Sequence, residues 1–267
     1  MPDPSCGHDR PVTVDVESHI ATVTFCRPPV NATVPESLIA IGDAFRALGD
    51  DREVRVAIFT ACGTRAFMAG ADLKAPLRGD PAALPPSRVV DPGAYARDAM
   101  WALYDCAVPV IGAINGPAIG AGLAFASLCD ILIAADTARF GATEINAGLL
   151  GASRHLVRMV GPYKARKMFF TGELVGADEL YRLGAVEQVV PLAELMVTAR
   201  ALAAELATKS PIALRLAKES MNRTEFLSIQ DGYRVEQDYT NRLLGFEDAA
   251  EARQAFQEKR PPDWKWR

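Results

Sequence analysis

The chain has 267 residues, 49% of them hydrophobic and 23% charged, which suits one large domain or a core domain with a smaller appendage. Its formal net charge of -4, without a basic stripe, argues against a nucleic-acid binder. The longest apolar stretch, residues 118–135, contains glycine, serine and aspartate and is too interrupted to span a bilayer. We therefore expect a cytoplasmic protein with no nucleic-acid partner and no membrane partner.

The five cysteines suggest neither a disulfide framework nor a metal site. They are odd in number and contain no CxxC pair. The polar N-terminus shows no signal-peptide pattern, so a reducing compartment is expected. We expect all five thiols to be reduced and no metal ion to be bound.

The first part of the chain predicts two strands, a helix and a buried strand. Apolar and polar residues alternate over 12–16 and again over 20–26, which is typical of two strands joined by a short turn. A helix is predicted from Pro35 to about Leu48, because apolar residues recur there on one stripe. A buried strand is predicted next, at about 55–60.

A proline-rich segment separates this part from the middle of the chain. Residues 76–92 show no clear period and predict a mobile surface loop. A helix around 93–104 then leads into a strand at 108–114. Residues 118–135 predict a buried helix followed by a strand at 131–135.

The last part of the chain is predicted to be helical almost throughout. The pattern runs from Leu192 to about Phe256, with a break at Ser210 and Pro211. These helices carry more apolar surface than a peripheral helix needs. We therefore expect them both to cap the core and to contact a neighbouring subunit.

Two turns built from small residues each come directly after a hydrophobic strand. The first turn, residues 66–74, comes after the apolar run 56–59, and the second, residues 115–122, comes after 108–114 and opens a helix. Turns this poor in side chains leave backbone N–H groups uncovered, so a ligand oxygen can approach them. Two such groups facing one another would form an oxyanion hole for a carbonyl oxygen. The turns indicate acyl chemistry, although such turns also serve helix–strand packing.

Several motifs resemble the signatures of one enzyme superfamily. Residues 66–74, AFMAGADLK, look like the F-x-A-G-A-D-[IL]-K signature of the crotonase (enoyl-CoA hydratase/isomerase) superfamily. Residues 115–130 are similar to its second signature. Residues 140–145, FGATEI, are similar to its F-G-x-P-E segment, with Thr143 in place of proline. Further matches in the same order extend the resemblance over roughly residues 12–260.

The resemblance implies a fold, an assembly and a substrate class. The implied fold is α/β, with a crotonase-like spiral of ββα units over residues 1–191 and a C-terminal helical trimerisation region over 192–267. The implied assembly is a homotrimer or homohexamer. The implied substrates are acyl-CoA thioesters, with coenzyme A as part of the substrate and no separate cofactor.

The resemblance also implies roles for individual residues. Ala71 and Ala121 would supply the oxyanion-hole N–H groups, and Glu144 would move protons on a thioester enolate. The expected substrate-binding residues lie in the two turns: Ala69, Gly70, Asp72, Leu73, Lys74 and Gly120. Candidates for contacts with the CoA phosphates are Lys74, Arg27, Lys259 and Arg260. Tyr95, Trp101 and Tyr104 are candidates for the acyl pocket, and packing in a helix core accounts for these three at least as well.

The chain departs from the superfamily pattern at two places. Many hydratases of the superfamily use two glutamates, but Ala124 stands where the first is expected. One carboxylate can still move a proton between two carbons or activate water alone. The loop 149–155 is also shorter than usual, which predicts an unusual acyl preference, and it contains His155, a residue that can titrate near neutral pH.

Three functions therefore stay open. The first is an enoyl-CoA lyase or isomerase with a single glutamate, and the second is a hydrolase that cleaves a C–C or thioester bond. The third is a catalytically weak acyl-CoA-binding protein. Less specific interpretations also apply: Glu144 as a solvated glutamate at a helix start, Asp72 as a helix-start aspartate, and His155 as a structural histidine.

Overall fold

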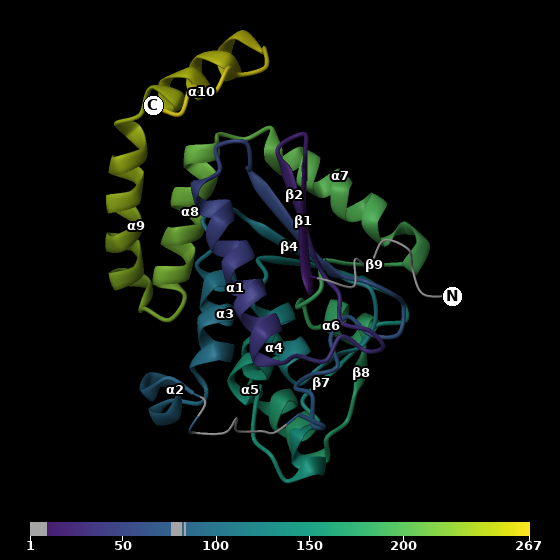
Figure 1. The fold of residues 1–267 in the computed structure, drawn as a ribbon. Coiled ribbons are helices and arrows are strands. Elements are labelled where there is room, and N and C mark those ends of the chain that lie inside the picture. The colour runs from purple at the N-terminus through teal and green to yellow at the C-terminus, as the bar shows by residue number, and fades with distance from the viewer. Residues whose placement is uncertain (1–9, 76–81, 83) are drawn as a thin grey trace.

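Two β-sheets carry the α/β core (Figure 1). The computed structural model describes residues 10–75, 82 and 84–267. The larger sheet has the order β1-β2-β3-β4-β6-β9, and its strands are β1 (Val12–Glu17), β2 (Ile20–Phe25), β3 (Val56–Ala61), β4 (Val110–Ile114), β6 (Ile131–Ala135) and β9 (Gln188–Val190). All neighbours in it are parallel except β1 and β2. The smaller sheet, in the order β5-β7-β8, contains β5 (Ala118–Ile119), β7 (Arg139–Gly141) and β8 (Val175–Gly176).

Helices cover both faces of the larger sheet, which explains why its central strands are continuously apolar. All six residues of β3 are buried. Ala57 and Phe59 pack toward the side of α1 (Pro35–Asp50) and α3 (Ala94–Tyr104), whereas Val56 and Ile58 pack toward α7 (Leu195–Ala207). Figure 1 shows α7 crossing one side of the sheet and the paired helices α1 and α3 on the other.

The remaining helices complete the two layers and the C-terminal region. They are α2 (Pro86–Val90), α4 (Ala121–Leu128), η1 (Glu144–Ala147), α5 (Ser153–Thr171), α6 (Ala177–Arg182), η2 (Leu192–Glu194), α8 (Pro211–Thr224), α9 (Ile229–Leu244) and α10 (Glu247–Glu258). The predicted helices and strands are confirmed to within a few residues. Of the predicted loop 76–92, the structure describes residues 82 and 84–92, which contain α2, and the rest lies outside the described residues.

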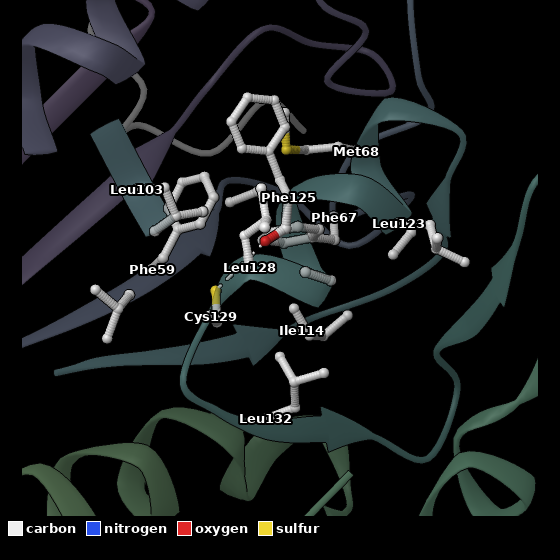
Figure 2. Packing of buried hydrophobic residues seen from close by; sticks show 14 of the residues in the cluster. Phe59, Phe67, Met68, Leu103, Ile114, Leu123, Phe125, Leu128, Cys129 and Leu132 are labelled. Carbon is white, nitrogen blue, oxygen red and sulfur yellow. Dashed lines mark hydrogen bonds between the residues drawn. The ribbon is translucent and has the colours of Figure 1, made fainter. Parts of the chain in front are cut away.

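A cluster of aromatic rings joins the sheet to the two small-residue turns. Phe59 of β3 packs edge-to-face against Phe45, Phe67 and Phe125, with ring centroids 5.2, 5.4 and 6.3 Å apart. Figure 2 shows the rings of Phe59, Phe67 and Phe125 in the same buried cluster as Met68 and Leu103. Because Phe67 belongs to the first turn and Phe125 to α4, the cluster holds both turns against one strand.

The chain repeats a strand–strand–helix unit that passes from the larger sheet to the smaller one. The segment β4-β5-α4 is one such unit, and β6-β7 with η1 and α5 is another. In each, the first strand belongs to the larger sheet and the second to the smaller sheet. The turns after β5 and β7 therefore open on the same small sheet.

The C-terminal helices leave the core after α7. Helices α8 and α9 pack as a pair around Ile212, Leu216 and Tyr239, and α10 contacts α9 (Figure 1). The buried ammonium of Lys218 on α8 ties this pair to the core through Asp130, at 2.8 Å. Within the described residues, no helix is both long and apolar enough to cross a membrane. The division at residue 192 and the trimerisation role stay predictions.

The expectation that all cysteines are reduced is wrong for one pair. Cys26 and Cys62 form a disulfide, with their Cα atoms 5.0 Å apart. Strands β2 and β3 pair in a register that places Phe25 opposite Ala61, so the next residue of each strand is also adjacent to its partner. Cys106 and Cys129 are buried thiols, and Cys6 lies outside the described residues.

Candidate active site

The two small-residue turns pair directly with each other. The N–H of Met68 donates to the carbonyl of Pro117 at 3.3 Å, and the N–H of Ile119 donates to the carbonyl of Met68 at 2.9 Å. Gly122 makes this approach possible, because a β-carbon there would lie 2.1 Å from the Met68 carbonyl oxygen. The first turn thus extends the small sheet beside β5.

Residue 71 is held by a second parallel bridge, to Thr33. The Thr33 N–H donates to the Gly70 carbonyl at 2.8 Å, and the Asp72 N–H donates to the Thr33 carbonyl at 3.0 Å. Because successive peptide groups of an extended chain point in opposite directions, the N–H of Ala71 points away from Thr33. Ala121 begins α4, where an N–H has no partner within its helix.

Ala71 and Ala121 line one cavity. Within the described residues, neither of their backbone N–H groups donates a hydrogen bond. The two turns are close at this point, since a β-carbon on Gly70 would lie 3.8 Å from the Ala121 nitrogen. The cavity has a volume of about 620 Å³, and Ala71, Ala121 and Glu144 all line it. The cavity therefore brings together one carboxyl group and two residues whose backbone N–H groups have no partner among the described residues.

Glu144 is the first residue of η1 and comes shortly after β7 along the chain. Its Oε2 atom is buried and has no hydrogen-bond partner among the described residues. Its Oε1 atom lies against two glycines, because a β-carbon on Gly120 or on Gly151 would come within 2.9 Å of it. Burial raises the pKa of this carboxyl above its ordinary value. Glu144 does lie at a helix start, as expected for a solvated glutamate, but it also lines the cavity.

The predicted substrate-binding residues divide into two groups. Ala69, Gly70, Leu73 and Gly120 line the cavity together with the three residues above, whereas Asp72 and Lys74 do not. Leu73 is 60% exposed. The cavity is therefore walled on one side by the first turn and on the other by the start of α4.

Asp72 fixes the first turn instead of opening a helix. Its Oδ1 accepts from the Lys74 N–H at 3.0 Å and its Oδ2 pairs with Arg27 at 2.9 Å. The backbone hydrogen bond, and then the guanidinium, lower the pKa of this carboxyl. The helix-start interpretation of Asp72 is wrong, because residues 72–75 form a turn.

The candidate cations for CoA phosphates also differ in their surroundings. Arg27 pairs with Asp72, and Arg260 pairs with Glu251 at 2.6 Å. Lys74 is exposed and, within the described part of the chain, takes part in no ion pair, and the same holds for Lys259. Lys74 ends the first turn and is the cation of this set nearest along the chain to the cavity.

Two further residues of the cavity, Ala124 and His155, bear on whether a second acid–base group is present. Ala124, 1% exposed, lines the cavity from α4 and contributes only a methyl group. His155 lines it from α5, and burial, together with Arg154 and Arg158, lowers the pKa of its imidazole. His155 is therefore favoured in its neutral form. Among the described residues, no group of acidic, histidine and cysteine side chains is arranged to hold a metal ion.

A second cavity of about 350 Å³ adjoins the first, and Met100 and His155 line both. Trp101 and Tyr104 line the second cavity, whereas Tyr95 lies under the guanidinium of Arg88, 4.3 Å from its ring centroid. Sequence reasoning missed Met100, whose only signal is its place in an apolar helix.

Comparisons with known proteins identify the family of this chain. A family model described as enoyl-CoA hydratase/isomerase matches residues 15–267. Carnitinyl-CoA dehydratase of Salmonella heidelberg (strain SL476) is 37% identical over 256 residues, which cover 93% of this chain and 95% of that protein. The structure of enoyl-CoA hydratase from Bacillus anthracis has a TM-score of 0.87 at 30% identity, over 97% of this chain and 100% of that one.

A second solved structure has the same fold. The enoyl-CoA hydratase of Mycobacterium smegmatis has a TM-score of 0.87 at 32% identity, over 96% of this chain and 99% of that one. These similarities confirm the crotonase-type α/β fold expected from the motifs. The chain belongs to the enoyl-CoA hydratase/isomerase family of the crotonase superfamily.

Proposed function

We propose that the protein interconverts acyl-CoA thioesters through a thioester enolate, with Glu144 as its single acid–base group. The observation that carries the proposal is the Glu144 carboxyl: its Oε2 is buried and unpartnered among the described residues, in the cavity that Ala71 and Ala121 also line. A buried carboxyl without a partner is costly for folding, so a role in the site accounts for it better than packing does.

In this proposal the Ala71 and Ala121 N–H groups receive the thioester oxygen. When a proton leaves the carbon next to the carbonyl, negative charge moves onto that oxygen. Two fixed donors stabilise the charge without reorganising, and the loss of one such donor costs roughly 10²–10³ in rate in other enzymes. The donors belong to the backbone, so the small side chains of both turns serve to keep them accessible.

One carboxyl group is sufficient for an elimination on one face of the substrate. Glu144 as a carboxylate takes the proton from the α-carbon, and the electron pair moves to the thioester oxygen. When the enolate collapses to the conjugated double bond, the β-hydroxyl leaves and takes that proton from Glu144 as water. The reverse order adds water. On a β,γ-unsaturated thioester, removal of the α-proton gives a dienolate instead, and return of the proton from Glu144 to the γ-carbon shifts the double bond.

The raised pKa of Glu144 supports this double role. A carboxylate with a raised pKa is a stronger base toward a weakly acidic carbon, and its protonated form persists long enough to pass the proton on. The dehydration for which the Salmonella relative is named corresponds to the elimination direction. We propose it, with its reverse, as the reaction of this chain.

We also propose that coenzyme A enters only as part of the substrate and that the chain acts as a homotrimer or homohexamer. Large apolar side chains on α9 and α10 support the assembly, since Ile229 is 89% and Phe256 86% exposed. Light scattering tests it, and a stable monomer at micromolar concentration contradicts it.

The substitution Glu144→Gln tests the reaction. We expect it to preserve folding and acyl-CoA binding and to lower turnover about 10²–10⁴-fold, the usual effect of removing a positioned acid–base group. Glu205→Gln on the exposed side of α7 is the matched control. Water addition and double-bond migration are both measured over enoyl-CoA substrates of several lengths. If Glu144→Gln retains more than about a tenth of wild-type kcat, Glu144 is not the essential acid–base group.

A further inference from the structure

The second cavity combines aromatic walls with an excess of positive charge. It is lined by Trp101, Tyr104 and Phe226 and by three arginines, against a single carboxylate, that of Glu225. It shares Met100 and His155 with the proposed reaction site, so it stands where the far end of an acyl chain would extend. That the occupant is an acyl chain rests on the proposed function.

Two of the three arginines are already neutralised by carboxylates. Arg97 pairs with Asp91, and Arg158 donates from Nε to Glu225 Oε1 at 2.8 Å. The other Glu225 oxygen accepts from the Tyr104 hydroxyl at 2.8 Å. Glu225 is therefore fully engaged before any ligand arrives.

Arg154 is the arginine of this cavity that, within the described residues, forms no ion pair, although its charge, after the hydrogen bonds from Arg158 and Tyr104, also lowers the pKa of Glu225. Its guanidinium lies 4.6 Å from the centroid of the Phe226 ring. Burial, and then the charge of Arg154, lowers the pKa of the His155 imidazole, which lines both cavities. A planar guanidinium with free donors is suited to a carboxylate, which it can bind with two parallel hydrogen bonds.

The same geometry disfavours a cationic acyl group. Aromatic faces bind quaternary ammonium groups only when they are open. Here arginines lie over each ring: Arg158 is 5.3 Å from the centroid of Tyr104, Arg97 is 5.7 Å from that of Trp101, and Arg154 covers Phe226. A ligand ammonium would meet these guanidinium groups and be repelled.

We infer that the second cavity receives the carboxylate end of a dicarboxylic acyl chain and that Arg154 binds it. The protein then prefers CoA thioesters of dicarboxylic acids over those of monocarboxylic acids of equal length. Arg154 is a specificity-determining residue in this assignment and takes no part in proton transfer.

Binding of saturated thioesters tests the inference without depending on the reaction. Calorimetry compares the CoA thioesters of straight-chain dicarboxylic acids of six, eight and ten carbons with monocarboxylic thioesters of the same lengths, and with one ending in trimethylammonium. At the length that reaches Arg154 we expect the dicarboxylic thioester to bind about 10- to 100-fold tighter, as a charge-assisted pair implies. The ammonium thioester is expected to bind most weakly.

Variants of one residue identify the partner of the carboxylate. Arg154→Met keeps the apolar length of the side chain and is expected to abolish the dicarboxylic preference, and Arg154→Lys to keep part of it. Arg166→Met, an exposed arginine of α5 beyond the break at Gly161 and outside both cavities, is the matched control and should keep the full preference. Equal affinities of the two thioester classes at every length in the wild type overturn the inference, as does a full preference in Arg154→Met.

The outcomes separate this inference from the proposed reaction. A dicarboxylic preference in a protein that turns over no enoyl-CoA leaves Arg154 in its role and removes the reaction. Turnover of enoyl-CoA without a dicarboxylic preference supports the reaction and removes the role of Arg154. Failure of every thioester to bind removes both.

Discussion

The Glu144 carboxyl lies so close to Gly120 that a β-carbon added there would be 2.9 Å from Oε1. A β-carbon added at Gly151, in the loop before α5, would also be 2.9 Å from this oxygen. The carboxyl is thus confined between two backbones that carry no side chains. This confinement fixes where a proton can be taken up and released.

The first prediction concerns these glycines. Gly151→Ala is expected to displace the Glu144 carboxyl and to lower kcat/KM about 10²-fold, since a small misplacement of a catalytic group has that order of effect. Gly120→Ala adds backbone strain, because its φ is +57°. Steady-state kinetics and thermal unfolding of both variants are compared with wild type.

Gly184→Ala is the control for strain alone. Its φ of +79° imposes the same kind of penalty, but an added β-carbon meets no atom within 4 Å. We expect Gly184→Ala to lose stability and keep its activity per folded molecule. Unchanged kcat/KM in Gly151→Ala would show that the carboxyl has room to move.

The sequence predicted this site in part, and the limit is set by long-range pairing. The local small-residue pattern identified both turns, and Glu144 lies just after a recognisable strand end. The pairing of Met68 with Ala118 depends on strands far apart in the chain, so no local pattern reveals it. The disulfide was missed for the same reason, since Cys26 and Cys62 meet only through the register of β2 and β3.

The second cavity was the least predictable feature of the site. Its walls come from α3, the end of α4, α5 and the segment after α8, which no motif links. Trp101 and Tyr104 fitted a helix core as well as a pocket wall. Arg154 was indistinguishable from a solvated arginine, because the lack of a carboxylate partner among the described residues is a property of the folded chain.

The second prediction concerns the pH dependence of stability. Burial raises the pKa of Glu144 above its ordinary value of 4.5, so the folded chain binds a proton at pH values where the unfolded chain has lost it. The associated stabilisation is complete below the ordinary value and is lost as the pH rises through the raised one. Relative to Glu144→Gln, the wild type should therefore lose stability across that window. Thermal unfolding of both proteins from acid to neutral pH measures the difference.

The same titration should appear in the activity. As the pH falls through the raised pKa, Glu144 becomes protonated and kcat/KM for the elimination falls with it. His155 lines the same cavity, so a His155→Gln variant is needed to assign the effect. If this variant loses the acid limb while Glu144 is intact, the limb belongs to the imidazole. Parallel stability curves for wild type and Glu144→Gln would contradict the burial of the carboxyl.

The last prediction concerns the missing second carboxylate. Ala124 lines the cavity from α4 and is 1% exposed, so Ala124→Glu places a carboxyl beside the site that Glu144 already serves. A second carboxylate can activate water while the first controls the proton delivered to carbon. We expect hydration of a short enoyl-CoA to rise, by up to about 10²-fold, at some loss of stability from burying the new group. Ala124→Gln has the same volume without the charge and should show no such rise. If a correctly folded Ala124→Glu hydrates no faster than Ala124→Gln, the prediction is wrong. In that case the shortened loop 149–155 has also altered the position of water. The methyl group of Ala124 is then not the feature that separates this site from one with two glutamates.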